Sequence, residues 1–167
     1  VEQKLRSEIQ IVLGDRTPTV EDIHNLQYTK MVISETLRMF PAAILLPRST
    51  INGDWIGNQY IPANSIVILY YYGLHHNSLI WEDPEIFRPE RFLPEASIGR
   101  SQFAWLPFSA GPRKCIGDEF AMMEMLLTVA MIIQRYNMKI TAYNSEPRIG
   151  TTSLPVHKPI MGTIQHR

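Results

Sequence analysis

The single cysteine of the 167-residue chain, Cys115, has the setting that most clearly suits chemistry. It follows Arg113 and Lys114 and lies between Gly111 and Gly117, just before a segment with helical periodicity that starts near residue 116. Nearby cations and the free N–H groups of a helix N-terminus favour a thiolate, and glycines let a bound group approach the backbone closely. The pattern favours a metal ligand or a nucleophile over the alternative, a buried core thiol.

A nucleophilic cysteine needs a base, so a cysteine protease is one reading of this residue. The chain contains five histidines, none of which is close to Cys115 in sequence: His24, His75, His76, His157 and His166. Separation along the chain neither supports nor excludes pairing with the thiol. Ligand and nucleophile therefore both stay open on these residues alone.

A second candidate site involves Glu35 and Arg38, which are spaced i, i+3 on a predicted helix and share a face. The simplest interpretation is a surface ion pair of small energetic value. The neighbouring residues are largely apolar, however, and an inward-facing pair would need further partners. Arg91, in the turn Pro89-Glu90-Arg91-Phe92, offers one, because it would anchor the irregular segment around it by reaching the Glu35 carboxylate.

A small set of helices must position these side chains. Apolar spacing predicts a helix over residues 1–13, stopped by Gly14. A second helical pattern runs from Thr19, an N-cap with Asp22 in a capping-box position, to about Met39, and Pro41 ends it. Residues 116–135 predict a long helix, apolar enough to be buried on most sides.

The segments between these helices predict strands and an irregular connection. Turn signals between short apolar runs predict a small antiparallel sheet over residues 44–72. Residues 73–114 have little periodicity, and a long irregular stretch in a compact domain usually has a function. The residues after 135 predict strands and a hairpin. The fold class that we expect is mainly α with small antiparallel β-sheets, an α+β arrangement in one domain over residues 1–167.

Composition excludes several classes of function. Hydrophobic residues make up 45% and charged residues 19%, which is typical of a globular domain. Lys plus Arg is 16 and Asp plus Glu is 16, so the charge balance gives no case for nucleic acid or an anionic membrane as partner. One cysteine cannot form an internal disulfide or a multi-cysteine zinc site. No apolar run approaches the roughly 20 residues that span a bilayer, and no signal or transit peptide is visible.

Taken together, the three motifs resemble the C-terminal third of the cytochrome P-450 fold, over the whole chain. The pattern F-x-x-G-x-R-x-C-x-G is met by Phe108, Gly111, Arg113, Cys115 and Gly117. The helical E-x-x-R and the P-E-R-F patterns follow the family's order and spacing. The resemblance implies the E-x-x-R helix, a small sheet, a meander, the cysteine-ligand loop, a long buried helix and a C-terminal hairpin.

The resemblance implies that Cys115 is the proximal thiolate ligand of the iron of haem b (iron protoporphyrin IX), where a thiolate favours O–O cleavage. Phe108 would pack beside the sulfur and shield it. Gly111 and Gly117 would give the cofactor room, and Arg113 and Arg48 would pair with haem propionates.

It also implies roles away from the iron. Glu35, Arg38 and Arg91 would form a structural triad that holds the meander near the haem. Ala43, Ile44 and Leu45 would be apolar substrate contacts. The acid/alcohol pair that assists oxygen activation in the family has no counterpart here, since no A-G-x-[DE]-T pattern is present, and we expect no catalytic residue in this chain beyond Cys115.

By resemblance, the parent enzyme is a monooxygenase that inserts one atom of O2 into a small apolar organic substrate, with electrons from a reductase or ferredoxin, separate or fused. A reducing intracellular compartment follows: the endoplasmic reticulum membrane for a eukaryotic enzyme or the cytoplasm for a bacterial one. Any membrane anchor would lie upstream. Two alternatives remain: a truncated, non-catalytic fragment that cannot bind haem alone, and a haem-thiolate peroxide isomerase or dehydratase.

Overall fold

A computed structural model describes residues 1–142 and 160–167 of the chain. Its α-helices are α1 (Glu2–Leu13), α2 (Gln27–Met39), α3 (Tyr71–His75) and α4 (Asp118–Arg135). Its strands are β1 (Leu45–Ser49), β2 (Asp54–Ile56), β3 (Gln59–Ile61), β4 (Ile66–Tyr70), β5 (Tyr136–Ala142) and β6 (Met161–His166). Short 3-10 helices are η1 (Val20–Asn25), η2 (Pro89–Phe92), η3 (Glu95–Ser97) and η4 (Gly111–Arg113).

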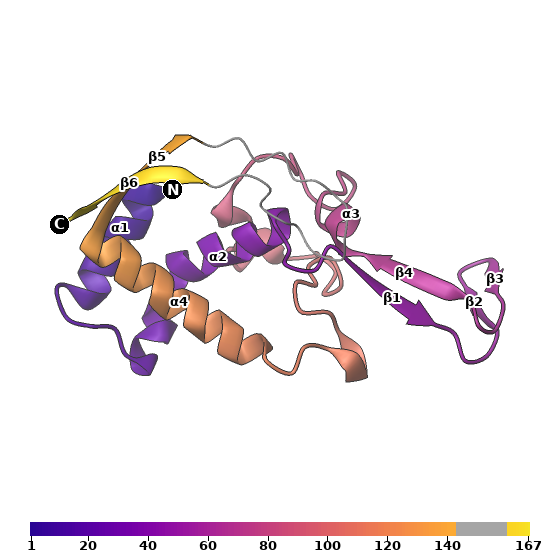
Figure 1. Cartoon of the computed structure of the whole chain (residues 1–167). Coiled ribbons are helices and arrows are strands. Elements are labelled where there is room, and N and C mark those ends of the chain that lie inside the picture. The colour runs from indigo at the N-terminus through magenta and orange to yellow at the C-terminus, as the bar shows by residue number, and fades with distance from the viewer. Residues whose placement is uncertain (143–159) are drawn as a thin grey trace.

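The expected fold class is confirmed, because helices dominate and every sheet is small and antiparallel. Figure 1 shows α1, α2 and α4 gathered in one body, from which the β1–β4 ribbon extends with β2 and β3 at its tip. The β5–β6 pair, predicted as a hairpin, is antiparallel, with Tyr136 opposite His166. The rest of that prediction, residues 143–159, lies outside the described residues.

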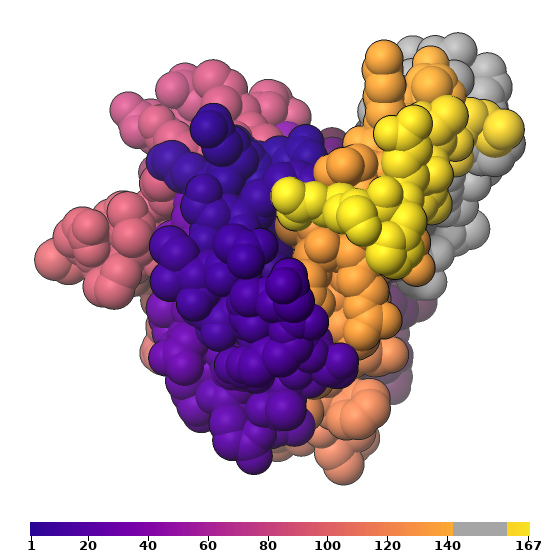
Figure 2. Space-filling view, turned by 90° about the vertical axis from the view of Figure 1, so that its left-hand side faces the viewer, coloured from indigo at the N-terminus to yellow at the C-terminus, as the bar shows by residue number. Residues whose placement is uncertain are grey.

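The core lies between α1, α2 and α4. It consists of apolar side chains that are at most 5% exposed: Leu5, Ile9 and Leu13 of α1, Leu26 and Ile33 around α2, and Leu126 and Ala130 of α4. Figure 2 shows the surface of α1 (indigo) beside the orange segment that contains the end of α4 and the start of β5, and Arg6 of α1 donates to the carbonyls of Ile133 and Tyr136 there. The core contacts of Leu26 and Ile33 hold α2, which carries Glu35 and Arg38, in place.

The helix predicted from Thr19 to Met39 is divided in two. Thr19 and Asp22 form the expected capping box, but it starts the 3-10 turn η1, and the helical path breaks at Leu26 before α2 begins. The break is sustained by tertiary contacts, because Leu26 is fully buried and Glu8 of α1 caps the new N-terminus. The Glu8 carboxylate accepts the N–H groups of Tyr28 and Thr29 at 2.5 and 2.8 Å.

The sheet predicted over residues 44–72 is confirmed as antiparallel, but it comprises two separate pairs. Strand β1 pairs with β4, with Arg48 opposite Val67, and β2 pairs with β3. The apolar run that begins at Ile66 leaves the strand after Tyr70, where α3 begins. Its last tyrosines therefore belong to a helix, and Tyr71 is buried there.

The prediction that the long helix is buried on most sides is wrong for this structure. Only Leu126 and Ala130 of α4 are buried, and Phe120 is 69% exposed. The reason is that α1, α2 and η1 cover one face of α4 and leave apolar side chains on the other face in the open. Within the described part of the chain, no helix is both long and apolar enough to span a bilayer.

Candidate functional site

Cys115 lies in an exposed loop between η4 and α4, with its thiol open to solvent. Its backbone N–H donates to the Phe108 carbonyl at 2.9 Å, and the Lys114 N–H donates to the Gly111 carbonyl at 3.1 Å. Gly111 has φ +75°, in the left-handed region that suits glycine. The loop is therefore a closed turn that leaves Cys115 exposed, and the buried-thiol alternative does not describe it.

The helix behind the cysteine begins slightly later than predicted, at Asp118 with Gly117 as N-cap. Lys114 reaches back over this start, with its Nζ 2.8 Å from the Asp118 carboxylate. That hydrogen bond lowers the pKa of Asp118 and raises the pKa of Lys114. Lys114 is thus paired, whereas Arg113 is exposed and has no carboxylate partner among the described residues.

Glu35, Arg38 and Arg91 meet in the interior. Arg38 donates through Nε and Nη2 to the two oxygens of Glu35, at 2.8 and 3.0 Å, and both side chains are fully buried. Arg91 Nε donates to Glu35 Oε1 at 3.0 Å, and the Arg88 backbone N–H adds a donor at 2.8 Å. The inward-facing interpretation of the pair thus matches the geometry, and the surface ion pair does not.

The two buried arginines donate their remaining N–H groups to backbone carbonyls in and beside the irregular segment. Arg38 donates to the carbonyls of His75 and Pro84, each at 2.7 Å. Arg91 donates to three carbonyls of one loop, those of Glu82, Asp83 and Ile86. Since these carbonyls lie at the last residue of α3 or in the irregular loop after it, the arginines satisfy backbone groups that no helix or strand satisfies.

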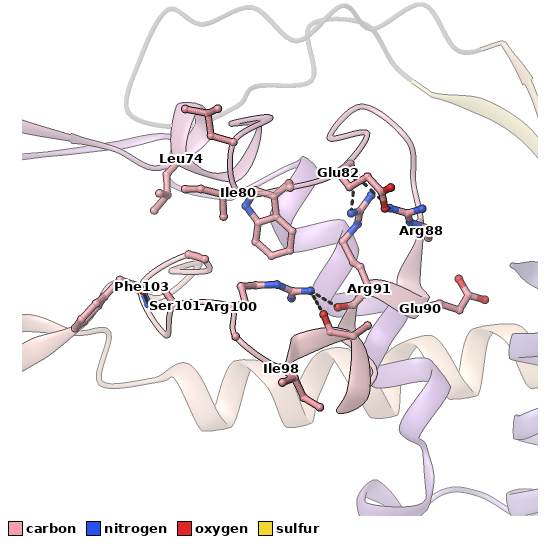
Figure 3. A pocket seen from close by; sticks show the side chains of 15 residues that line it. Leu74, Ile80, Glu82, Arg88, Glu90, Arg91, Ile98, Arg100, Ser101 and Phe103 are labelled. Atoms are coloured by element: carbon pink, nitrogen blue, oxygen red, sulfur yellow. Dashed lines mark hydrogen bonds and ion pairs between the residues drawn. The ribbon is translucent and has the colours of Figure 1, made fainter.

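An additional arginine, Arg100, continues this layer at a surface pocket. Figure 3 shows Arg100 reaching the carbonyl of Arg91, and its guanidinium lies 4.5 Å from the ring centre of the buried Trp81. Burial, aided by Arg91, lowers the pKa of Arg100. Sequence reasoning missed Arg100 and Trp81, because a lone arginine and a lone tryptophan carry no spacing signal.

The short helix α3 connects this network with the cysteine loop, which sequence reasoning also missed. The Tyr71 hydroxyl donates to Ser109 Oγ at 2.9 Å, and the Leu106 N–H donates to His75 Nε2 at 2.9 Å. His75 is fully buried. Among the described residues, no hydrogen bond joins a histidine to Cys115, so the geometry gives the protease reading no base; His157 lies outside the described residues.

The residues expected near a substrate are only partly accessible. Ala43 is exposed and Leu45 is half-buried, but Ile44 is fully buried beneath α3, where its carbonyl accepts the N–H of Tyr72. Ile44 therefore offers no surface to a ligand in this structure. Arg48 is exposed on β1, and the one hydrogen bond of its guanidinium within the described residues goes to the Pro47 carbonyl at 3.4 Å.

The donor chemistry of the loop fits haem. Among the described residues no cluster of His, Cys, Asp and Glu could hold a bare metal ion, whereas a single exposed thiolate suits a metal that brings most of its own ligands, as haem iron does. A Cβ built on Gly111 or Gly117 would meet no atom within 4 Å, which leaves room beside the sulfur for a flat group. The exposed guanidinium of Arg113, which has no carboxylate partner among the described residues, suits a carboxylate on such a group.

Comparisons with known proteins find relatives over most of the chain. The sequence model of the family described as Cytochrome P450 matches residues 1–162. The chain is 39% identical over 157 residues to Protein LUTEIN DEFICIENT 5, chloroplastic, of Arabidopsis thaliana, covering 92% of this chain and 26% of that protein. It is 40% identical over 140 residues to Cytochrome P450 3A5 of Homo sapiens, covering 83% of this chain and 28% of the relative.

A bacterial relative shows the same degree of similarity. Cyclooctat-9-en-7-ol 5-monooxygenase of Streptomyces melanosporofaciens is 39% identical over 139 residues, covering 83% of this chain and 30% of that protein. The chain thus spans less than a third of the length of these curated relatives. The sequence motifs, the loop geometry and the family match coincide over nearly the whole chain, and the chain belongs to the cytochrome P450 family.

Proposed function

We propose that the chain is the haem-ligating part of a longer haem-thiolate monooxygenase that oxidises a small apolar organic substrate with O2. The observation that carries this proposal is the exposed Cys115 on a closed turn, supported by the buried Glu35 network. Haem b, when bound, supplies the oxygen chemistry, and thiolate ligation tunes it towards O–O cleavage. The chain itself supplies ligation, orientation and charge.

In this proposal each loop residue has one task. Cys115 donates its thiolate to the iron, and Phe108 lies beside the sulfur and limits the access of water. Gly111 and Gly117 leave space for the ring, and Arg113 pairs with a propionate carboxylate. Arg48 of β1 is the second propionate partner, which its exposure and lack of a carboxylate partner within the described residues permit.

The remaining residues position the cysteine loop and contact the substrate. Glu35, Arg38 and Arg91 hold the irregular segment of residues 73–114 in the shape that the loop needs, and they do no chemistry. Ala43 and Leu45 are the substrate contacts that remain accessible. We place the enzyme in a reducing intracellular compartment, since Cys115 must stay a free thiolate, and we expect a reductase or ferredoxin to supply electrons.

For the chain by itself, one observation favours a second proposal, a fragment that does not function alone. Apolar side chains next to the loop and along the ribbon are exposed, among them Ile116, Phe120, Ile66 and Ile68. Such surface favours self-association. We expect the 167-residue chain with added hemin to bind weakly and without O2-dependent turnover; tight stoichiometric uptake with turnover would contradict this view.

The monooxygenase proposal is tested on the longer protein that carries this chain. Substrate oxidation should require NAD(P)H, a reductase and O2, and one atom of labelled O2 should appear in the product. Cys115→Ser should abolish turnover, whereas Ser101→Ala, an exposed change in the meander, should preserve it. Turnover of a hydroperoxide without reductant or O2 would instead identify an isomerase or dehydratase and overturn the proposal.

A further inference from the structure

Helix α3 places two buried polar side chains against the segment that leads into the cysteine loop. Tyr71 and His75 are spaced i, i+4, so they share one face of the helix. Tyr71 is 5% exposed and His75 is fully buried. The Tyr71 side chain bonds to the Ser109 hydroxyl and the His75 ring bonds to the Leu106 backbone N–H, and both partners lie in the stretch that precedes Cys115.

His75 joins the buried ion-pair network to this segment. Its backbone carbonyl accepts Arg38 Nη1 at 2.7 Å, and its ring Nε2 accepts the Leu106 N–H at 2.9 Å. An Nε2 that accepts an N–H carries no proton, so the proton of the neutral ring lies on Nδ1. Burial, aided by the neighbouring His76 and Arg38 side chains, lowers the pKa of His75 to about 4, which keeps the ring neutral at pH 7.

The protonated Nδ1 of His75 has no hydrogen-bond partner among the described residues. A buried donor without an acceptor destabilises the fold, and an apolar side chain of similar size would avoid that penalty. The acceptor at Nε2 is the property of histidine that this site uses.

Backbone hydrogen bonds connect the region of Leu106 with the backbone of Cys115. The Leu106 carbonyl accepts the Ser109 N–H at 3.2 Å, and the Phe108 carbonyl between them accepts the Cys115 N–H at 2.9 Å. Ser109 has φ +66°, a left-handed conformation that a serine holds only when its surroundings impose it. The hydroxyl of Tyr71, 2.9 Å from Ser109 Oγ, supplies such a restraint.

We propose that His75 is a positioning residue for the cysteine loop: through its Nε2 it fixes Leu106, and with Tyr71 it sets the backbone turn that presents Cys115. The proposal deepens the proposed function and rests on it only for the identity of Cys115 as the haem ligand. The positioning itself concerns contacts within this chain, so it can be tested without the cofactor.

The test is amide hydrogen exchange on the 167-residue chain, read at Leu106 and Ser109 and at core amides of α2. His75→Leu removes the acceptor and should speed exchange at Leu106 by about fivefold or more, with α2 unchanged. His75→Gln keeps an acceptor at a similar reach and should restore slow exchange. Tyr71→Phe, which keeps the ring, should speed exchange at Ser109 with little change at α2.

Unchanged protection at Leu106 in His75→Leu, or equal acceleration in His75→Leu and His75→Gln, would overturn the positioning role. If His75→Leu loses structure throughout, Tyr71→Phe and His75→Gln still decide the matter. A second readout uses the longer haem-loaded protein, where His75→Leu should broaden or shift the thiolate-haem absorption band and His75→Gln should not. Failure of this arm alone, with the exchange result intact, would count against the proposed function and not against the positioning.

Discussion

Replacing Glu35 with glutamine is the sharpest perturbation of the buried network, because it changes one oxygen to nitrogen at almost constant volume. The Glu35 carboxylate accepts four hydrogen bonds, two from Arg38, one from Arg91 and one from the Arg88 backbone. Three of these reach Oε1 and one reaches Oε2. If the amide oxygen keeps the crowded position, the new NH2 group faces Arg38 Nε, donor against donor.

The magnitude follows from the charges that are left behind. Arg38 is fully buried and Arg91 is 5% exposed, and Glu35→Gln removes the one carboxylate that both of them contact. Breaking a buried pair in this way destabilises by about 3–5 kcal/mol. Since natural domains are stable by about 5–15 kcal/mol, the variant should lose a large part of its stability.

The assay is urea unfolding of the chain, followed by tryptophan fluorescence and far-ultraviolet circular dichroism. Trp81, which is 1% exposed, lies against the Arg38 and Arg91 guanidinium groups and reports on this region. With a slope of about 2 kcal/mol/M, the midpoint should fall by about 2 M. The matched control is Glu82→Gln, whose carboxylate pairs with Arg88 at the surface and should change the midpoint little. A loss below about 1 kcal/mol for Glu35→Gln, or an equal loss in both variants, would refute the reasoning.

Three further predictions concern other parts of the chain. As the pH falls from 7 towards 4, His75 takes up a proton near pH 6.5 in the unfolded state but only near its pKa of about 4 in the folded state, so the free energy of unfolding should fall by about 3 kcal/mol. Urea midpoints measured against pH check this, and His75→Gln should lack the part of the pH dependence that comes from the imidazole. Glu8→Ala should cost about 1–2 kcal/mol in thermal or urea unfolding, because it uncaps the N-terminus of α2; no loss would mean that solvent caps the helix equally well. Gly111→Ala should cost about 1 kcal/mol through its positive φ, whereas Gly117→Ala, with φ −100°, should cost less in the same melts; the reverse order would contradict the loop geometry.

The features that could be predicted from sequence are those with local or strongly patterned causes. The α1 helix follows from apolar periodicity and its Gly14 stop, and α4 follows from periodicity with a small error at its start. The capping box at Thr19 and Asp22 was visible because its members are three residues apart. Residue spacing also identified Glu35 and Arg38, the P-E-R-F turn pointed to Arg91, and the structure brings the three side chains together.

The features that could not be predicted depend on residues far apart in the chain. Glu8 caps α2 from another helix, and its contact with Thr29 spans 21 residues. No local sequence pattern therefore indicates that the helical path breaks at Leu26. His75 contacts Leu106 across 31 residues. The burial of Ile44 depends on α3 folding back over it, and the exposure of Phe120 depends on which elements cover α4.

The central claim, that the Cys115 sulfur ligates haem iron, is tested most directly by the absorption spectrum of the ferrous–CO complex of the longer protein that carries this chain. We predict the strongly red-shifted Soret band of a thiolate-ligated haem in the parent protein and its loss in Cys115→Ser, with the haem still bound. Ser101→Ala should retain the band. An unshifted band in the parent protein, or a red-shifted band that survives Cys115→Ser, would contradict the account.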